Sequence, residues 1–364
     1  MNRLILAGVA VLGCLTVACA QSAGTPALDN RSAAWKQNLA LAVNDPTKVA
    51  GVMQSIPEAD RAAFAADVLE VLQTKRQYMP DKAAWAQEFS ATAAALIAGA
   101  GGAKNAVLST VSAEIVNACV TGESHELASG DLAQLGILEK STMLQLQGDD
   151  RVAFASAMLL AVGKQSTTDA DVHKLAISTT ALALVAGAGD AKTSVVADIF
   201  AVVPLADLGT VAQAFSDVFN QRKNSLGNDD YQQMALQTLQ AVAARTAGQP
   251  GVVTGFAYVV ATFVGGAANP AQFEQDLTGK LADLLAKMGM TQESLATALA
   301  AAKTDMAANA ALLQTLYPTL SRKTVWGVIV LTPDSLLGWQ VTITPPTSTG
   351  LRRPPPSGYQ NQGI

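Results

Sequence analysis

The chain of 364 residues is half hydrophobic, with 5% aromatic residues, 15% charged residues and a formal net charge of −5. An acidic balance argues against nucleic-acid binding, which depends on clustered lysine and arginine. A chain of this length can bury a large core without disulfides. Few charges together with few aromatic side chains are typical of helices that pack closely through small residues.

The first twenty residues have the layout of a secretory signal peptide. Arg3 precedes an uncharged apolar stretch, and Ala18, Cys19 and Ala20 form the small-x-small pattern that signal peptidase recognises. We therefore expect residues 1–20 to be removed on export to the periplasm or to the outside of the cell. A retained membrane anchor is the weaker interpretation, because the apolar run of about 17 residues is shorter than the roughly 20 that span a bilayer.

The same segment offers a second processing route. Residues 15–19, LTVAC, resemble the lipoprotein box of bacteria, although a threonine stands where that box prefers an aliphatic residue. Lipidation at Cys19 would tether the protein to a membrane. If cleavage follows Ala20 instead, Cys119 is the cysteine that is left, and its apolar surroundings (EIVNACV) predict a buried, inert thiol.

After an expected linker at residues 21–33, the sequence repeats itself. DRAAFAADVL at residues 60–69 matches DRVAFASAML at residues 150–159 in six of ten positions, and DDYQQMALQTLQAV at residues 229–242 is a fainter third copy. Apolar residues recur at i, i+4, i+7 and i+8, as on one face of a helix. The sequence predicts an all-α helical repeat domain over residues 34–316, with about three units of roughly 80–90 residues at 56–120, 146–225 and 228–303.

Each unit is expected to hold an amphipathic helix, an apolar helix, a glycine joint and a further helix. Ser55-Ile56-Pro57-Glu58 has the spacing of a capping box, and Asp169 precedes another helix start. The apolar helices at 89–103, 175–189 and 251–269 carry no charge. A central position in a stack explains all three. Three units are about the minimum for a stable array, so both a solenoid and a compact bundle are open.

The C-terminal residues differ in character. β-branched residues and tryptophan at 324–331 and 338–344 predict a short β-hairpin within residues 317–344. Residues 345–364 hold five of the fourteen prolines, and we expect a disordered tail. A proline-rich segment is already extended and loses little entropy on docking, so we list one candidate partner contact there: Arg352, Arg353, Pro354, Pro355 and Pro356. A solvated terminus is the alternative.

Two glycine blocks, LIAGAGGAK at 96–104 and LVAGAGDAK at 184–192, suggest phosphate loops at first sight. A P-loop ends in Gly-Lys-Ser/Thr, whereas Lys104 and Lys192 follow alanine. The dinucleotide fingerprint needs a third glycine and a preceding strand, which neither block supplies. Glycine here fits a helix C-terminus that needs a left-handed residue before a sharp reversal. We predict structural joints and no cofactor.

Residues suited to catalysis are few. His125 and His173 lie among charges at expected helix starts, without the ligand spacing of zinc or calcium sites. HExxH, GxSxG and CxxC motifs are missing. The pairs at 149–150 and 229–230 are aspartates that recur just before a helix, where a carboxylate favours the helix dipole. We expect no catalytic, cofactor-binding or metal-binding residue, and not an enzyme.

These features favour an exported, non-catalytic helical repeat protein that acts as a scaffold or protein-binding module in the bacterial cell envelope. A protein is the expected partner. One alternative is a carrier of an apolar ligand or lipid, because uncharged helices can line a cavity. Another is a membrane-associated envelope protein, held through residues 251–269.

Overall fold

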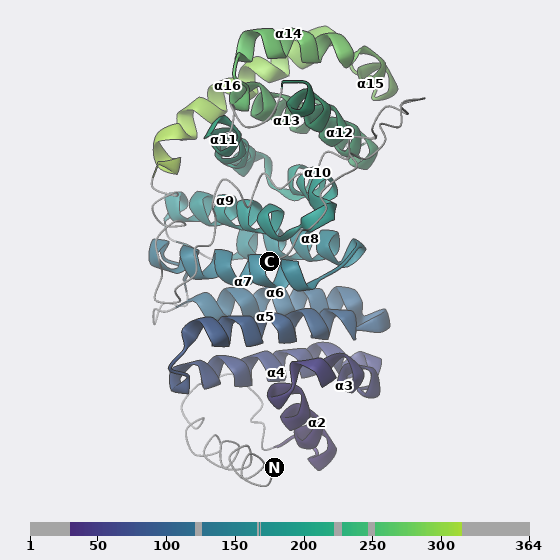
Figure 1. The fold of residues 1–364 in the computed structure, drawn as a ribbon, viewed down its shortest axis with the longest axis vertical. Coiled ribbons are helices and arrows are strands. Elements are labelled where there is room, and N and C mark those ends of the chain that lie inside the picture. Colours follow the sequence, from purple (N-terminus) through teal and green to yellow (C-terminus); the bar gives the residue numbers. More distant parts are fainter. Residues whose placement is uncertain are drawn as a thin grey trace, which may run out of the picture.

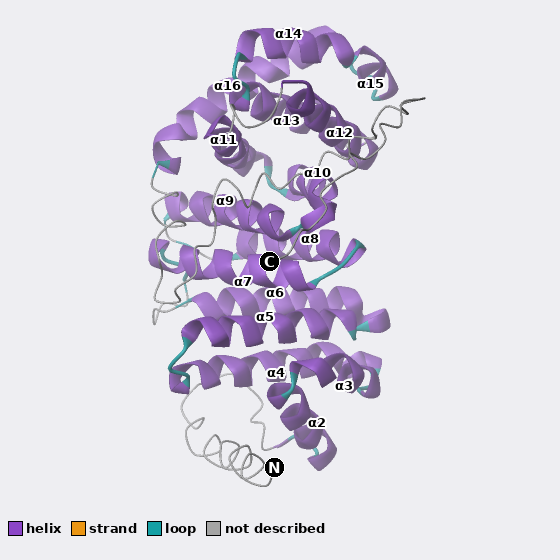
Figure 2. Ribbon diagram, in the orientation of Figure 1, coloured by secondary structure: helices purple, strands orange, loops and turns teal. Residues whose placement is uncertain are grey.

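The computed structural model describes residues 30–120, 126–165, 167, 169–221, 228–246 and 252–314. These residues form fifteen α-helices joined by short turns and loops, and none of them lies in a strand (Figure 1; Figure 2). The all-α class predicted from the sequence is confirmed for this part of the chain. The expected signal peptide, β-hairpin and proline-rich tail lie outside the described residues.

Most helices fall into two rows, in which each helix packs on the next helix but one along the chain (Figure 1). The first row holds α2 (Ala33–Asn44), α4 (Arg61–Lys75), α6 (Lys104–Cys119), α8 (Asp149–Lys164), α10 (Lys192–Val202) and α12 (Asn228–Thr246). The second row holds α3 (Val49–Ser55), α5 (Lys82–Ala98), α7 (Leu132–Gln145), α9 (Ala170–Gly187), α11 (Leu205–Gln221) and α13 (Val252–Gly266). Successive pairs therefore follow one another along the long axis of the molecule.

The last three helices cover the C-terminal end of the rows. α14 (Pro270–Lys280) packs on α12 and α13, and α15 (Ala282–Lys287) packs on α14. α16 (Gln292–Leu313) folds back across α13, α11 and α9. Its buried residues recur at helical spacing along one stripe: Leu295, Leu299, Ala302, Met306, Asn309 and Leu313.

Polar contacts fix α16 in this position. The Tyr258 hydroxyl of α13 donates to the Asp305 carboxylate at 2.7 Å. The amide oxygen of Asn309 accepts from the Thr210 hydroxyl of α11 at 3.0 Å and from the Lys174 ammonium of α9 at 3.2 Å. One helix thus bridges three helices of the second row.

The second row supplies the most buried helices. Thirteen of the 18 residues of α9 are buried, and α13 buries nine consecutive residues, 256–264. With α5, these helices hold most of the three uncharged stretches of the sequence, and the structure shows that all three helices are largely buried. Within the described ranges, no helix combines the length and the apolar character needed to cross a membrane.

The helix starts agree with the sequence at one place and differ at another. Asp169 caps α9 as expected, since its side chain accepts from two backbone amides of the first turn. The capping box expected at Ser55 is wrong. Ser55 ends α3 and its hydroxyl donates to the Val52 carbonyl at 2.7 Å. The physical reason is Pro57, whose extended ψ of 138° separates α3 from a 3₁₀ turn that leads into α4.

Candidate functional site

The two glycine blocks form equivalent joints, each braced by an arginine. Gly101 and Gly189 have φ of 55° and 57°, the left-handed conformation that glycine tolerates best. Nη1 of Arg61 donates to the carbonyl that precedes Gly101 at 2.9 Å, and Nη1 of Arg151 does the same before Gly189 at 3.0 Å. Arg61 and Arg151 occupy one position of the repeat, so the same contact recurs in both copies.

The first glycine of each block has a different role. Gly99 has an ordinary φ of −83° and needs no left-handed conformation. A β-carbon added at Gly99 would lie 2.7 Å from the β-carbon of Met53 in α3, and one added at Gly187 would lie 2.7 Å from that of Met143 in α7. These glycines therefore allow neighbouring helices of the second row to touch.

The lysine that follows each block interacts with the packed helices, through an ion pair in one copy and through burial in the other. Lys104 forms an ion pair with Asp150 in the first turn of α8, at 2.6 Å. Lys192 is 4% exposed, and burial together with the neighbouring Lys140 lowers the pKa of its ammonium group. The blocks therefore act as joints in this fold, as the sequence predicts.

The histidines and the cysteine lie apart from one another. His173 is half-buried in the first turn of α9, with Nε2 3.4 Å from Oδ2 of Asp207 in α11. His125 lies outside the described residues. Cys119 is fully buried, as predicted, and its thiol donates to the Ile115 carbonyl at 3.2 Å. Burial raises the pKa of this thiol well above its ordinary value, which keeps it protonated.

No constellation for chemistry emerges from the part of the chain that the structure describes. There, no group of three or more His, Cys, Asp and Glu side chains is placed to hold a metal ion. The processing residues Ala18, Cys19 and Ala20 lie outside the described ranges. The same holds for the tail contact at Arg352, Arg353 and residues 354–356. Both remain predictions.

A groove between α6 and α8 is the candidate binding site. Its volume is about 510 Å³, within the range of small-ligand and side-chain pockets. One wall comes from α6 through Asn105, Leu108, Ser109, Ala113, Val116 and Asn117. The other comes from α8 through Ala153, Ser156, Ala157, Leu160, Ala161 and Lys164. At 1.5 Å per helical residue, the α6 wall is about 18 Å long.

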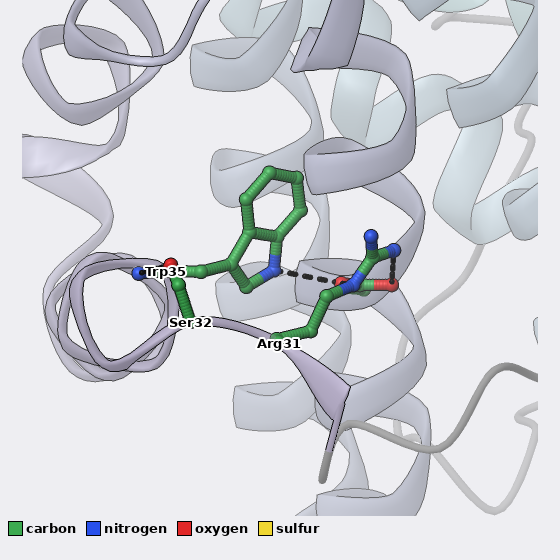
Figure 3. A network of polar contacts seen from close by, with 4 residues as sticks. Arg31, Ser32 and Trp35 are labelled. Atoms are coloured by element: carbon green, nitrogen blue, oxygen red, sulfur yellow. Dashed lines mark hydrogen bonds and ion pairs between the residues drawn. The ribbon is translucent and has the colours of Figure 1, made fainter.

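The equivalent junction near the N-terminus holds a polar network around the Trp35 side chain (Figure 3). The Trp35 ring of α2 packs edge-on against Phe64 of α4 with centroids 5.3 Å apart. Its indole N–H donates to Asp67 at 2.8 Å, and Arg31 pairs with the same carboxylate at 3.0 Å. An aromatic side chain and its polar partners thus occupy the space between α2 and α4.

The groove arises where the second copy departs from the other two. In the alignment of the copies, Asp67 corresponds to Ala157, and Glu70 corresponds to Leu160. The third copy has glutamine at both positions, 237 and 240. Two positions that are polar in the other copies are therefore apolar in α8, and Leu160 is 50% exposed. This change was visible in the aligned sequence, but sequence reasoning did not use it.

The groove has a cationic end. Lys164 is exposed in the last turn of α8, and no ion-pair partner is found for it among the described residues. Its apolar walls and single cation give the groove the properties of a binding surface. Among its polar side chains, the Ser156 hydroxyl donates to the Asp198 carboxylate of α10, which also pairs with Arg245.

Comparison with known proteins does not add to this. No protein-family model, curated protein or solved structure matches the chain.

Proposed function

We propose that this chain is an exported, non-catalytic helical repeat protein that serves as a scaffold or protein-binding module in the bacterial cell envelope. The proposal rests mainly on one observation: the same contacts occur at equivalent positions in the first two copies of the repeat. Arg61 and Arg151 brace equivalent joints, and Gly99 and Gly187 allow equivalent helix contacts. Repeated internal contacts of this kind are typical of stacked arrays, which expose long surfaces to partners.

The array is solenoid-like rather than a compact bundle in this proposal. Support comes from the packing, because helices of each row contact mainly their neighbours in the row and in the adjacent pairs. α2 and α12 lie toward opposite ends of the long axis (Figure 1). Stacked helix pairs present long continuous surfaces, which suit protein partners.

Export is part of the proposal through the expected signal peptide at residues 1–20. The test begins with the intact denatured mass of the protein recovered from its own envelope. We expect a chain that starts at Gln21, or one that carries acyl mass on Cys19. A mass that includes residues 1–20 would contradict the export step.

Partner binding is tested by affinity purification from envelope extracts, with co-purifying proteins quantified against a variant retained in the cytoplasm by deletion of residues 2–20. We expect a protein that is enriched at near-stoichiometric yield with the exported form alone. If every protein co-purifies in equal yield with the exported form and with the cytoplasmic variant, the scaffold proposal is refuted.

A carrier of an apolar ligand is the second candidate, favoured by the apolar walls of the groove. It predicts a small-molecule adduct in the native mass spectrum of the recovered protein. The scaffold proposal predicts a protein-sized increase in mass instead, so one spectrum separates the two.

A further inference from the structure

We infer that the groove between α6 and α8 is the docking site for an amphipathic helix of a partner protein. This helix presents large apolar side chains to Ala157 and Leu160 and a carboxylate to Lys164. The inference rests on the proposed protein-binding function and names the site and the chemistry of its partner.

α8 differs from the equivalent helices of the other two copies at two positions. Positions that hold Asp67 and Glu70 in the first copy, and glutamines in the third, hold Ala157 and Leu160 in the second. Asp67 is satisfied by Trp35 and Arg31, and the exposed glutamines are solvated by water, whereas a half-exposed leucine gains free energy when a partner covers it. The second copy is thus the one whose outward face favours a contact.

An aromatic side chain occupies the equivalent space elsewhere in the molecule. Between α2 and α4, the indole of Trp35 packs on Phe64 and donates its N–H to Asp67. The α8 copy keeps the phenylalanine as Phe154 but replaces the acceptor with Ala157. The space left beside Ala157 therefore suits a large apolar side chain that has no donor to satisfy.

The shape of the groove favours a helix as its occupant. A groove between two neighbouring helices accepts the ridge of a third helix, as in helix-in-groove recognition. α16 packs in this way on the second row, with an apolar stripe and a polar bond from Tyr258 to Asp305 at its edge. The length of about 18 Å corresponds to about twelve residues of helix, which is three turns.

The charge at one end of the groove favours an acidic group on the partner. Lys164 lies at one end of the groove, and the other polar groups along the walls are amides and hydroxyls, as at Asn105, Ser109 and Asn117. A carboxylate on the partner meets a cation at that end and fixes the direction of the helix. The contact is exposed, so it contributes more to orientation than to affinity.

The test uses a synthetic helical peptide of about 18 residues as the probe. It carries leucines and one tryptophan at i, i+4 and i+7, and a glutamate beyond one end of that stripe. Its binding to the full mature chain is followed by fluorescence anisotropy. The double variant Ala157→Asp/Leu160→Glu should weaken binding at least tenfold. It should also fold, because Ala157 is partly exposed and Leu160 is exposed, so both new carboxylates can reach water.

Two controls accompany the double variant. Leu205→Glu changes an exposed leucine on α11, away from the groove, and should leave binding within twofold. Lys164→Glu should weaken the glutamate peptide severalfold and strengthen a peptide in which that glutamate is lysine. Such a reversal is not produced by a general loss of stability.

Three outcomes of the peptide experiment would overturn the inference. The first is a peptide that binds the double variant as well as the parent chain. The second is no peptide binding at all. The third is binding of dodecanoate that the double variant abolishes, which would assign the groove to an amphiphile. If the parent chain and the double variant capture the same envelope partner equally, the groove is not the docking site, but the proposed protein-binding function stands. If neither captures a partner, both the docking site and the proposed function are refuted.

Discussion

At the residue scale, Gly99 and Gly101 lie two positions apart and meet different steric demands. Gly101 is left-handed, a conformation that costs other residues about 1–2 kcal/mol. Gly99 has ordinary backbone angles but touches α3, where the Ala50 carbonyl oxygen would lie 2.7 Å from an added β-carbon. The sequence predicts the joint, but it cannot tell the two roles apart, because the second depends on a contact with another helix.

Gly99→Ala should therefore destabilise the fold, by about 1–3 kcal/mol, through overpacking between α3 and α5. Gly51→Ala is the matched control, since no other atom lies within 4 Å of a β-carbon placed there. Because alanine favours a helix over glycine, this control should be neutral or stabilising by up to about 1 kcal/mol. Urea unfolding of both variants measures the difference, and equal effects would refute the steric role of Gly99.

Glu139 gives the stability of the protein a pH dependence. The residue is fully buried in α7, where Oε1 accepts from the Thr180 hydroxyl at 2.6 Å and Oε2 has no partner among the described residues. Burial raises the pKa of this carboxyl well above its ordinary value. Above pH of about 4.3 the unfolded chain loses this proton while the folded chain keeps it. The folded state then binds more protons, so stability falls as pH rises toward the folded pKa.

Glu139→Gln should remove this loss, because an amide has no proton to release in that range. The free energy of unfolding of the parent chain should fall relative to that of the variant between pH 5 and pH 8. Urea titrations at both values check this, and parallel pH profiles would rule out a buried neutral carboxyl. This burial could not be predicted from the sequence, since LEKSTMLQ at residues 138–145 resembles an exposed helix face.

At the element scale, one carboxylate of α4 binds two side chains at the start of α2 and just before it. Asp67 accepts from both the Trp35 indole and the Arg31 guanidinium. Asp67→Ala should cost about 1–3 kcal/mol, because two donors lose their acceptor, and should speed amide exchange in α2. Lys48→Ala removes an exposed pair with Asp45 and should leave the stability nearly unchanged, because water screens the pair. Unchanged exchange in α2 of the Asp67 variant would show that this carboxylate does not hold the helix.

Sequence periodicity predicted some helices better than others. α4 and α8 show an apolar stripe opposite a polar face, and that contrast located them. In α7, residues 132–139 are all buried, so no polar face marks its period, and the unit predicted from the sequence did not include it as a separate helix. The groove was missed for a related reason. Ala157 and Leu160 look ordinary alone and become informative only beside Asp67 and Glu70.

At the scale of the whole molecule, contacts are mostly between near neighbours in the chain, except where α16 folds back on α9, α11 and α13. In such an array a local defect should open its own region first. Phe64→Ala, which empties a fully buried site in α4, should cost about 3–5 kcal/mol. It should accelerate amide exchange in α2 to α5 while leaving α11 to α16 protected.

Phe256→Ala in α13 is the mirror experiment, because Phe256 is also fully buried. It should accelerate exchange in α11 to α16 and spare α4. Uniform acceleration along the chain in either variant would mean one cooperative globule, and the solenoid-like description would fail.

In the proposed function, this array binds a protein in the cell envelope. Native mass spectrometry of the protein recovered from its own envelope without detergent tests it most directly. We predict a complex whose mass exceeds that of the mature chain by the mass of another protein, and which Ala157→Asp/Leu160→Glu shifts toward the free chain. A spectrum of the free chain alone, or of the chain with only a lipid-sized adduct, would contradict the claim.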